Sequence, residues 1–233
     1  MEIPPHYAHQ GEPPVTSETW AARRRYAAAL RQLASLAVTN DADAEQLDAL
    51  TAQLGEQIET LGAVGQKHGK NSHAEFSPGA STAEEQALRN VSSHELSPLV
   101  GLANPVSPPL NMWFDGDKVH GRVTLGWQHE GPPGFAHGGY VAAIFDEFLG
   151  SGQILTERPG PTGTLSLRYL RPTPLNVELT LTGWVERQDS RKNLLRGELS
   201  CDGQVLVSAE GLFILIPKER YHPNAGSTGI AAD

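Results

Sequence analysis

Residues 131–150 read GPPGFAHGGYVAAIFDEFLG, and this stretch decides the fold. Its first half is a loop rich in glycine and proline. Its second half carries apolar residues at helical spacing, namely Val141, Ile144, Phe145, Phe148 and Leu149. The pattern predicts one largely apolar helix of about 17 residues. Such a helix must be covered by the rest of the domain, so the flanking sequence has to supply that surface.

The flanking sequence is dominated by predicted strands. Before the helix, residues 110–114 and 119–125 lie on either side of a turn at 115–117, which predicts a hairpin. After the helix, four further strands are predicted at residues 165–170, 177–186, 194–201 and 205–216. A hairpin, one helix and a run of antiparallel strands predict an α+β fold in which a curved sheet wraps a central helix.

The chain in front of this unit differs in composition. We expect residues 1–16, which carry four prolines, to be disordered. Residues 17–61 contain two amphipathic segments joined by a short polar turn and predict a helical hairpin extension. Residues 62–93 predict a linker with a short helix near its end, residues 94–217 the folded domain, and residues 218–233 a flexible tail. The hairpin is interpreted as a packing extension or, alternatively, as a docking or oligomerisation arm.

The overall composition limits the functional classes. The 233 residues include 18 Lys+Arg against 27 Asp+Glu and no run of basic residues, so neither nucleic acid nor an anionic membrane surface is an expected partner. The lone Cys201 cannot form an intrachain disulfide, and no Cys/His cluster has the spacing of a metal site. The first residues have neither the basic nor the apolar region of a signal peptide, and no run of about 18 apolar residues occurs, so we expect neither a leader nor a membrane span. A cytoplasmic protein is therefore expected.

The start of the predicted helix offers backbone donors. Gly138 and Gly139 allow close approach, and first-turn N–H groups have no partner within a helix, so they can bind developing negative charge. Asp146 lies two turns further on, flanked on its face by Ala142 and Ala143. The eight residues from Gly138 to Asp146 span about 12 Å, too far for both groups to contact one carbonyl. If they act together, they belong to antiparallel helices of two subunits, which predicts a homodimer.

The run GPPGFAHGGYVAAIFDE, followed by TGTLSLRYLRPTPL, resembles the hotdog-fold acyl-CoA thioesterases, specifically the PaaI-like and THEM-type branch, over residues 108–217. The resemblance implies a dimer, and we expect a homodimer or a dimer of dimers that hydrolyses acyl-CoA without a metal or cofactor. It also implies that Asp146 is the catalytic carboxylate, as general base or nucleophile, and that the Gly138 N–H polarises the thioester carbonyl. His137 would position the substrate or the loop, and Thr162 would orient the attacking water.

Other residues are candidates for substrate binding. Gly139, Arg168 and Arg171 are assigned to this role, the arginines because their guanidinium groups suit the phosphates of coenzyme A. Two alternatives to a thioesterase stay open. One is a hotdog module that binds acyl-CoA for regulation without catalysis, and the other is a hotdog hydratase or dehydratase.

Two positions near the predicted site depart from the pattern or carry no assigned role. Relatives often have an amide before the His-Gly-Gly run, and here the candidates are Gln128, His129 and Glu130. Glu147 follows Asp146 directly but is rotated by one residue around the helix, so we expect it to be a surface charge.

Overall fold

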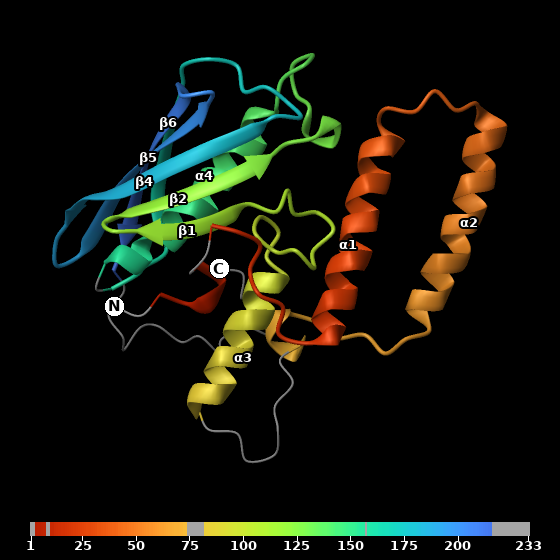
Figure 1. Cartoon of the computed structure of the whole chain (residues 1–233), viewed down its shortest axis with the longest axis horizontal. Helices are drawn as coiled ribbons and strands as arrows, with labels where there is room; N and C mark the ends of the chain where they lie inside the picture. Colours follow the sequence, from red (N-terminus) through yellow and green to blue (C-terminus); the bar gives the residue numbers. More distant parts are fainter. Residues whose placement is uncertain (1–2, 8–9, 74–81, 157, 216–233) are drawn as a thin grey trace, which may run out of the picture.

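The computed structural model describes residues 3–7, 10–73, 82–156 and 158–215. Its centre is a six-stranded antiparallel sheet, ordered β1-β2-β4-β5-β6-β3, that curves around helix α4, Gly138–Gly152 (Figure 1). The strands are β1 Asn111–Asp115, β2 Lys118–Thr124, β3 Thr162–Tyr169, β4 Glu178–Gln188, β5 Lys192–Cys201 and β6 Gln204–Ile214. The predicted α+β arrangement, with a sheet wrapped around one helix, is confirmed.

The apolar face of α4 lies directly on the sheet. Phe145, Phe148 and Leu149 are fully buried there. Glycines on the inner face of the strands make room for them: a Cβ at Gly183 would lie 2.8 Å from the Phe148 ring, and one at Gly197 would lie 3.1 Å from Leu149. Because any larger residue would push the helix outward, these glycines set how deeply α4 sits in the curve of the sheet.

Strand β3 is an edge strand that pairs with β6 and with no other strand in the described part of the chain. It begins with a β-bulge, because the register shifts between Thr162 and Thr164. Gly163 is the extra residue, and a Cβ there would lie 2.6 Å from the Ile214 side chain. The bulge therefore requires glycine and redirects the first residue of the strand, Thr162.

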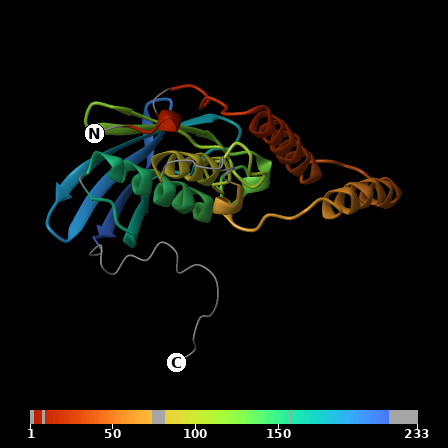
Figure 2. The same cartoon turned by 90° about the horizontal axis from the view of Figure 1, so that it is seen from below.

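Two long helices, α1 Glu18–Ala37 and α2 Ala44–Gly62, form the expected hairpin extension and project from the body of the domain (Figures 1 and 2). Helix α1 is fastened to the body by a buried ion pair. The Arg24 Nε donates to both carboxylate oxygens of Glu95 at 3.1 Å, and Arg31 donates to the Leu102 and Asn104 carbonyls. No helix of the described ranges is long and apolar enough to cross a membrane.

The segments between the hairpin and the sheet carry some structure of their own. Helix α3, Thr82–Glu95, occupies the end of the expected linker. We expected residues 1–16 to be disordered, whereas the described part includes a 3-10 turn, Pro5–Tyr7, whose Tyr7 is 8% exposed and belongs to the core. Its hydroxyl lies 3.0 Å from the Ser151 Oγ. The ring is apolar and its hydroxyl has a partner, which accounts for its burial. The expected tail, residues 218–233, lies outside the described ranges.

Candidate active site

The first turn of α4 leaves one backbone donor unpaired. His137 is the N-cap, and its Nδ1 accepts a hydrogen bond from the Gly139 N–H at 3.0 Å. The His137 carbonyl accepts from the Tyr140 N–H at 3.0 Å. The Gly138 N–H has no acceptor among the residues that the structure describes. A single unpaired N–H thus lies at the positive end of a 15-residue helix, where it can bind an oxyanion.

A tyrosine from β3 supports this first turn. The Tyr169 hydroxyl donates to the Gly138 carbonyl at 2.8 Å, although the side chain is 52% exposed. A phenol is already protonated at neutral pH, and partial burial raises the pKa of Tyr169 further, so its hydroxyl is a donor. Sequence reasoning missed this residue, because a tyrosine in an exposed strand is ordinary and only the packing of β3 beside α4 gives it a partner.

The carboxylate end of the site is built from α4 and the bulged start of β3. The Thr162 Oγ1 donates to the Asp146 Oδ1 at 2.8 Å. Asp146 is exposed in the single chain, and its neighbours Ala142, Ala143 and Gly150 are only half-buried. Two residues that were singled out separately in the sequence therefore touch, beside an open surface lined by small side chains.

The two ends of the site are not brought together within one chain. Asp146 and Gly138 lie eight residues apart on one helix, which corresponds to about 12 Å. Strand β3 contacts the helix at both ends of this interval, with Thr162 beside Asp146 and Tyr169 beside Gly138. Each chain therefore presents a carboxylate and, about 12 Å away along α4, an unpaired backbone N–H beside the same strand.

The three residues expected to bind substrate have different surroundings. Gly139 has already committed its N–H to His137. Arg171 donates to the Val205 carbonyl at 3.0 Å, so it ties down the chain after β3. Arg168 is exposed on β3, and its side chain makes no hydrogen bond or ion pair within the described residues. Of these three, Arg168 is the side chain that a phosphate could engage at no cost to an existing contact.

The residues before the His-Gly-Gly run hold the loop in shape. The His129 carbonyl accepts from the His137 N–H at 2.8 Å, and Glu130 Oε1 accepts from the Gly134 N–H at 2.6 Å. His129 is buried, which lowers its pKa and keeps the ring neutral. The Gln128 Oε1 is buried without a partner among the described residues. The side chains of His129 and Glu130 are both hydrogen-bonded within the loop, so Gln128 is the candidate for the amide position whose side-chain oxygen has no partner.

Glu147 is not the surface charge that was expected. It is half-buried on a different side of α4 from Asp146, and the Ser97 hydroxyl approaches its Oε2 at 3.4 Å. Burial raises the pKa of Glu147. The covering residues come from the segment after α3 and from the N-terminal turn, so only the tertiary structure could show this environment.

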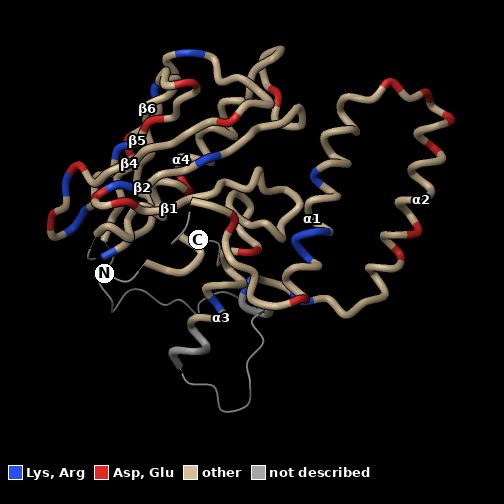
Figure 3. The backbone as a smooth tube through the Cα atoms, viewed as in Figure 1, with Lys and Arg blue, Asp and Glu red and all other residues tan. Residues whose placement is uncertain are grey.

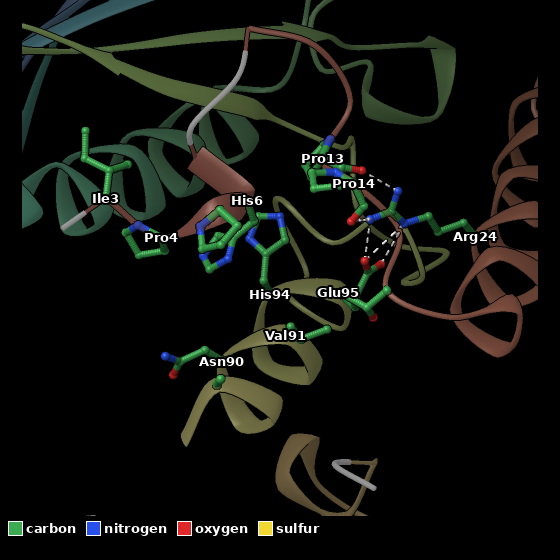
Figure 4. A pocket seen from close by; sticks show the side chains of 13 residues that line it. Ile3, Pro4, His6, Pro13, Pro14, Arg24, Asn90, Val91, His94 and Glu95 are labelled. Carbon is green, nitrogen blue, oxygen red and sulfur yellow. Dashed lines mark hydrogen bonds and ion pairs between the residues drawn. The ribbon is translucent and has the colours of Figure 1, made fainter. Parts of the chain in front are cut away.

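A cavity of 620 Å³ lies away from the candidate site (Figure 4). It lies between the N-terminal segment and α3, and its lining includes Val91, His94 and the Arg24–Glu95 ion pair. The His94 and His6 rings lie 4.3 Å apart, and burial lowers their pKa values to about 3 and about 4. The cavity touches neither end of the site described above.

Comparison with known proteins gives consistent matches. A sequence model of the thioesterase superfamily matches residues 133–208. Acyl-coenzyme A thioesterase THEM4 of Xenopus laevis is 32% identical over 87 residues, 36% of this chain and 39% of that protein. THEM4 of Bos taurus is 33% identical over 93 residues, 39% of this chain and 38% of that protein. The aligned parts thus span about two fifths of the length of these curated relatives.

A solved structure matches much more of the chain. The crystal structure of a protein described as a thioesterase superfamily protein superposes with a TM-score of 0.67 and 32% sequence identity. The match covers 87% of this chain and 97% of that one, so it includes residues in front of the sheet as well as the sheet and α4. The predicted hotdog fold is confirmed by this likeness.

Proposed function

The chain belongs to the thioesterase superfamily, and from this premise we propose that it hydrolyses an acyl-CoA thioester to a free carboxylic acid and coenzyme A. The observation that carries the proposal is the Asp146 carboxylate, held at 2.8 Å by the Thr162 hydroxyl on an exposed face of α4. The substrate class is supported by the curated relatives, which are named as acyl-coenzyme A thioesterases.

Asp146 acts as the general base in this proposal. Thr162 occupies Oδ1, which leaves Oδ2 to accept a proton from water. As the proton moves to Oδ2, the water oxygen attacks the thioester carbonyl carbon and forms a tetrahedral oxyanion. Collapse of this intermediate breaks the carbon–sulfur bond, and the proton on Asp146 passes to the departing thiolate of coenzyme A. The products are the carboxylic acid and the free thiol.

The Gly138 N–H stabilises the oxyanion. It is the unpaired donor at the start of α4, and the dipole of the helix adds favourable potential there. His137 limits the free donors of the first turn to Gly138, because its imidazole accepts the hydrogen bond of the neighbouring Gly139 N–H. Tyr169 holds the Gly138 carbonyl and so orients the turn that presents the donor.

Because Asp146 and Gly138 of one chain are about 12 Å apart, the complete site combines Asp146 of one subunit with Gly138 of a second. Two features support this homodimer. The small residues around Asp146 leave α4 open to close approach, and β3 has an unpaired edge within the described residues. Edge strands of this kind are natural pairing surfaces. A twofold dimer would contain two such composite sites.

A complementation experiment tests the composite site. Gly138→Pro removes the N–H and adds a ring, which the backbone accepts because the first helical position tolerates proline and His137 is already extended at φ −65 and ψ 129. The carbonyl that Tyr169 binds is retained. Gly138→Ala is the matched variant, since it keeps the N–H and its Cβ would meet the Tyr169 hydroxyl at an ordinary 3.4 Å.

We expect Gly138→Pro and Asp146→Asn each to lose nearly all activity in a thiol-release assay, and Gly138→Ala to lose far less. When the two inactive chains are coexpressed in equal amounts, half of the dimers are mixed and each mixed dimer has one intact site. The mixture should therefore recover about a quarter of wild-type turnover. No recovery would contradict a site shared between subunits. Absence of thiol release from a panel of acyl-CoA substrates would contradict hydrolysis itself. Loss of the conjugated enoyl absorbance from an enoyl-CoA, without thiol release, would indicate hydration instead.

A further inference from the structure

The Asp146 carboxylate is held by a single side chain. Helix α4 carries only two charged residues, Asp146 and Glu147, in an otherwise uncharged stretch, as Figure 3 shows. No basic side chain pairs with Asp146 in the part of the chain that the structure describes, and the Thr162 hydroxyl is the one hydrogen-bond donor to its carboxylate there. The place of that hydroxyl therefore sets how the carboxylate faces the water that it activates. Small misplacements of such groups are costly to turnover, so the residues that fix the start of β3 bear on the chemistry.

A buried glutamine binds the chain just before Thr162. Gln153 follows α4 directly, in the 3-10 turn Gln153–Leu155, and is 3% exposed. Its side-chain amide pairs with the Gly160 backbone as a neighbouring strand would, because the Nε2 donates to the Gly160 carbonyl and the Oε1 accepts from the Gly160 N–H, both at 2.9 Å. Two reciprocal hydrogen bonds fix the direction of the backbone at Gly160 as well as its position. Gly160 also lies so close to the Ile214 carbonyl that a Cβ would have no room.

A second buried amide supports the first. Asn193, the second residue of β5, is fully buried. Its Nδ2 donates to the Arg158 carbonyl at 2.8 Å and to the Thr156 Oγ1 at 3.1 Å, and it lies 3.3 Å from the Gln153 Oε1. The Asn193 Oδ1 is buried without a partner among the described residues, so this amide is costly to bury and the contacts of its Nδ2 account for its place. Each of those contacts goes to the connection between α4 and β3.

The sheet alone fixes Thr162 less firmly than the rest of β3. The register of β3 with β6 shifts between Thr162 and Thr164, and a bulge leaves its extra residue out of the ladder. Thr162 therefore stands at the irregular end of its pairing, two residues after the backbone that Gln153 binds. The anchor at Gly160 supplies the restraint that the bulge removes.

We propose that Gln153 and Asn193 are positioning residues for the reaction. Gln153 fixes Gly160 and, with it, the Thr162 hydroxyl. Asn193 fixes Gln153 and the connection around it. Both side chains are buried, so they do not contact the substrate and act through Thr162. The inference rests on the proposed function, since the position of Thr162 matters to turnover only if Asp146 acts on the substrate.

Thiol release from acyl-CoA by the full-length chain tests the proposal. Gln153→Met keeps the length of the side chain and removes both hydrogen bonds to Gly160. The matched control is Val123→Ala, which creates a small cavity in the core on β2, a strand separated from β3 by three others. Chemical denaturation of both chains shows whether they fold and how far each is destabilised. Asn193→Ala is a second, milder variant, because it leaves the two hydrogen bonds to Gly160 in place.

We expect Gln153→Met to lower kcat by about three- to tenfold, and no further than Thr162→Val does, with little change in KM. Asn193→Ala should lower kcat by about threefold, and Val123→Ala should leave it unchanged. Beside Thr162→Val, neither Gln153→Met nor Asn193→Ala should have a further effect, because the hydroxyl through which they act is already absent.

Wild-type kcat in a folded Gln153→Met chain would overturn the proposal. So would a loss that adds to that of Thr162→Val, or an equal loss in Val123→Ala. If Gln153→Met does not fold, the same outcomes in Asn193→Ala decide. These results differ from failure of the proposed function, in which the wild-type chain releases no thiol or Asp146→Asn keeps its turnover.

Discussion

Replacing Asp146 by asparagine tests the centre of the proposed mechanism. Asparagine has the size of aspartate and keeps an oxygen that can accept the hydrogen bond from the Thr162 hydroxyl, which lies 2.8 Å from the Asp146 Oδ1 in the wild-type chain. It removes the ability to take a proton from water. Because Asp146 is exposed in the single chain, the change should leave the fold intact and shift the free energy of unfolding by no more than about 0.5 kcal/mol.

The loss of a positioned general base lowers turnover by about 100- to 10,000-fold, which corresponds to about 2.7 to 5.5 kcal/mol in the activation free energy. Removing the Thr162 hydroxyl with Thr162→Val costs less, because the base remains and loses one hydrogen bond to a charged group. We expect about 1.5 to 3 kcal/mol before solvent screening, and therefore a reduction of about tenfold in turnover. The KM for acyl-CoA should change little in either variant.

The assay is thiol release under saturating acyl-CoA for the two single variants and the double variant. If Thr162 acts through Asp146, Thr162→Val should lower turnover in the wild-type background and have no further effect beside Asp146→Asn. Glu147→Gln is the matched control, because it makes the same chemical change one residue along the helix at a side chain outside the site. Retention of more than about a tenth of turnover by Asp146→Asn would refute the assignment of a base. Incorporation of labelled water oxygen into Asp146 during a single turnover would show that Asp146 acts as a nucleophile instead of a general base.

Four further predictions follow from the same geometry. His137→Ala should lower the free energy of unfolding by about 1 kcal/mol in chemical denaturation, because the Gly139 N–H loses its cap, and His137→Asn should restore most of it. Tyr169→Phe should lower kcat by about two- to tenfold with little change in KM, since the Gly138 carbonyl loses one hydrogen bond; an unchanged kcat would remove Tyr169 from the site. Arg168→Ala should raise the KM for acyl-CoA about tenfold and leave kcat unchanged, whereas an acyl substrate on a short thiol lacking the coenzyme phosphates should show no difference. Burial lowers the pKa of His6 to about 4 and of His94 to about 3, so the unfolded chain binds more protons than the folded chain below pH 6.5. The free energy of unfolding should therefore fall as the pH falls from 6.5 toward 4, by up to about 1.4 kcal/mol per pH unit for each histidine. The raised pKa of Glu147 acts in the opposite direction, so the slope should be measured by urea unfolding in His94→Gln and in Glu147→Gln.

The architecture was predictable from local patterns, because each pattern has one simple structural cause. The spacing of Ile144, Phe145 and Phe148 is that of a helix with a buried face, and the structure buries all three. The alternation along the later strands follows from a sheet with one covered face. The separation of Gly138 from Asp146 was likewise readable, since it depends only on the rise of a helix.

The surroundings of individual side chains could not be predicted in the same way. Glu147 is half-buried and Tyr7 enters the core because segments distant in sequence cover that side of α4. Tyr169 reaches Gly138 only once β3 has been placed at the edge of the sheet beside the helix. The contact between Thr162 and Asp146 lies at the bulge of Gly163, where the nearby Ile214 side chain leaves no room for a Cβ. None of these partners lies close enough in sequence to leave a periodic signal.

The placement of strand β3 has a consequence for the kinetics of the proposed dimer. Its first residue, Thr162, holds the Asp146 of one active site, and its last residue, Tyr169, holds the Gly138 that completes the other. Seven residue steps of extended chain, about 23 Å, therefore join the supports of two separate sites. In the proposed dimer both supports lie on one strand, so a displacement of β3 at one site would reach the Gly138 turn of the other. Coupling of this kind would appear as a saturation curve that departs from a simple hyperbola and that Tyr169→Phe returns to one.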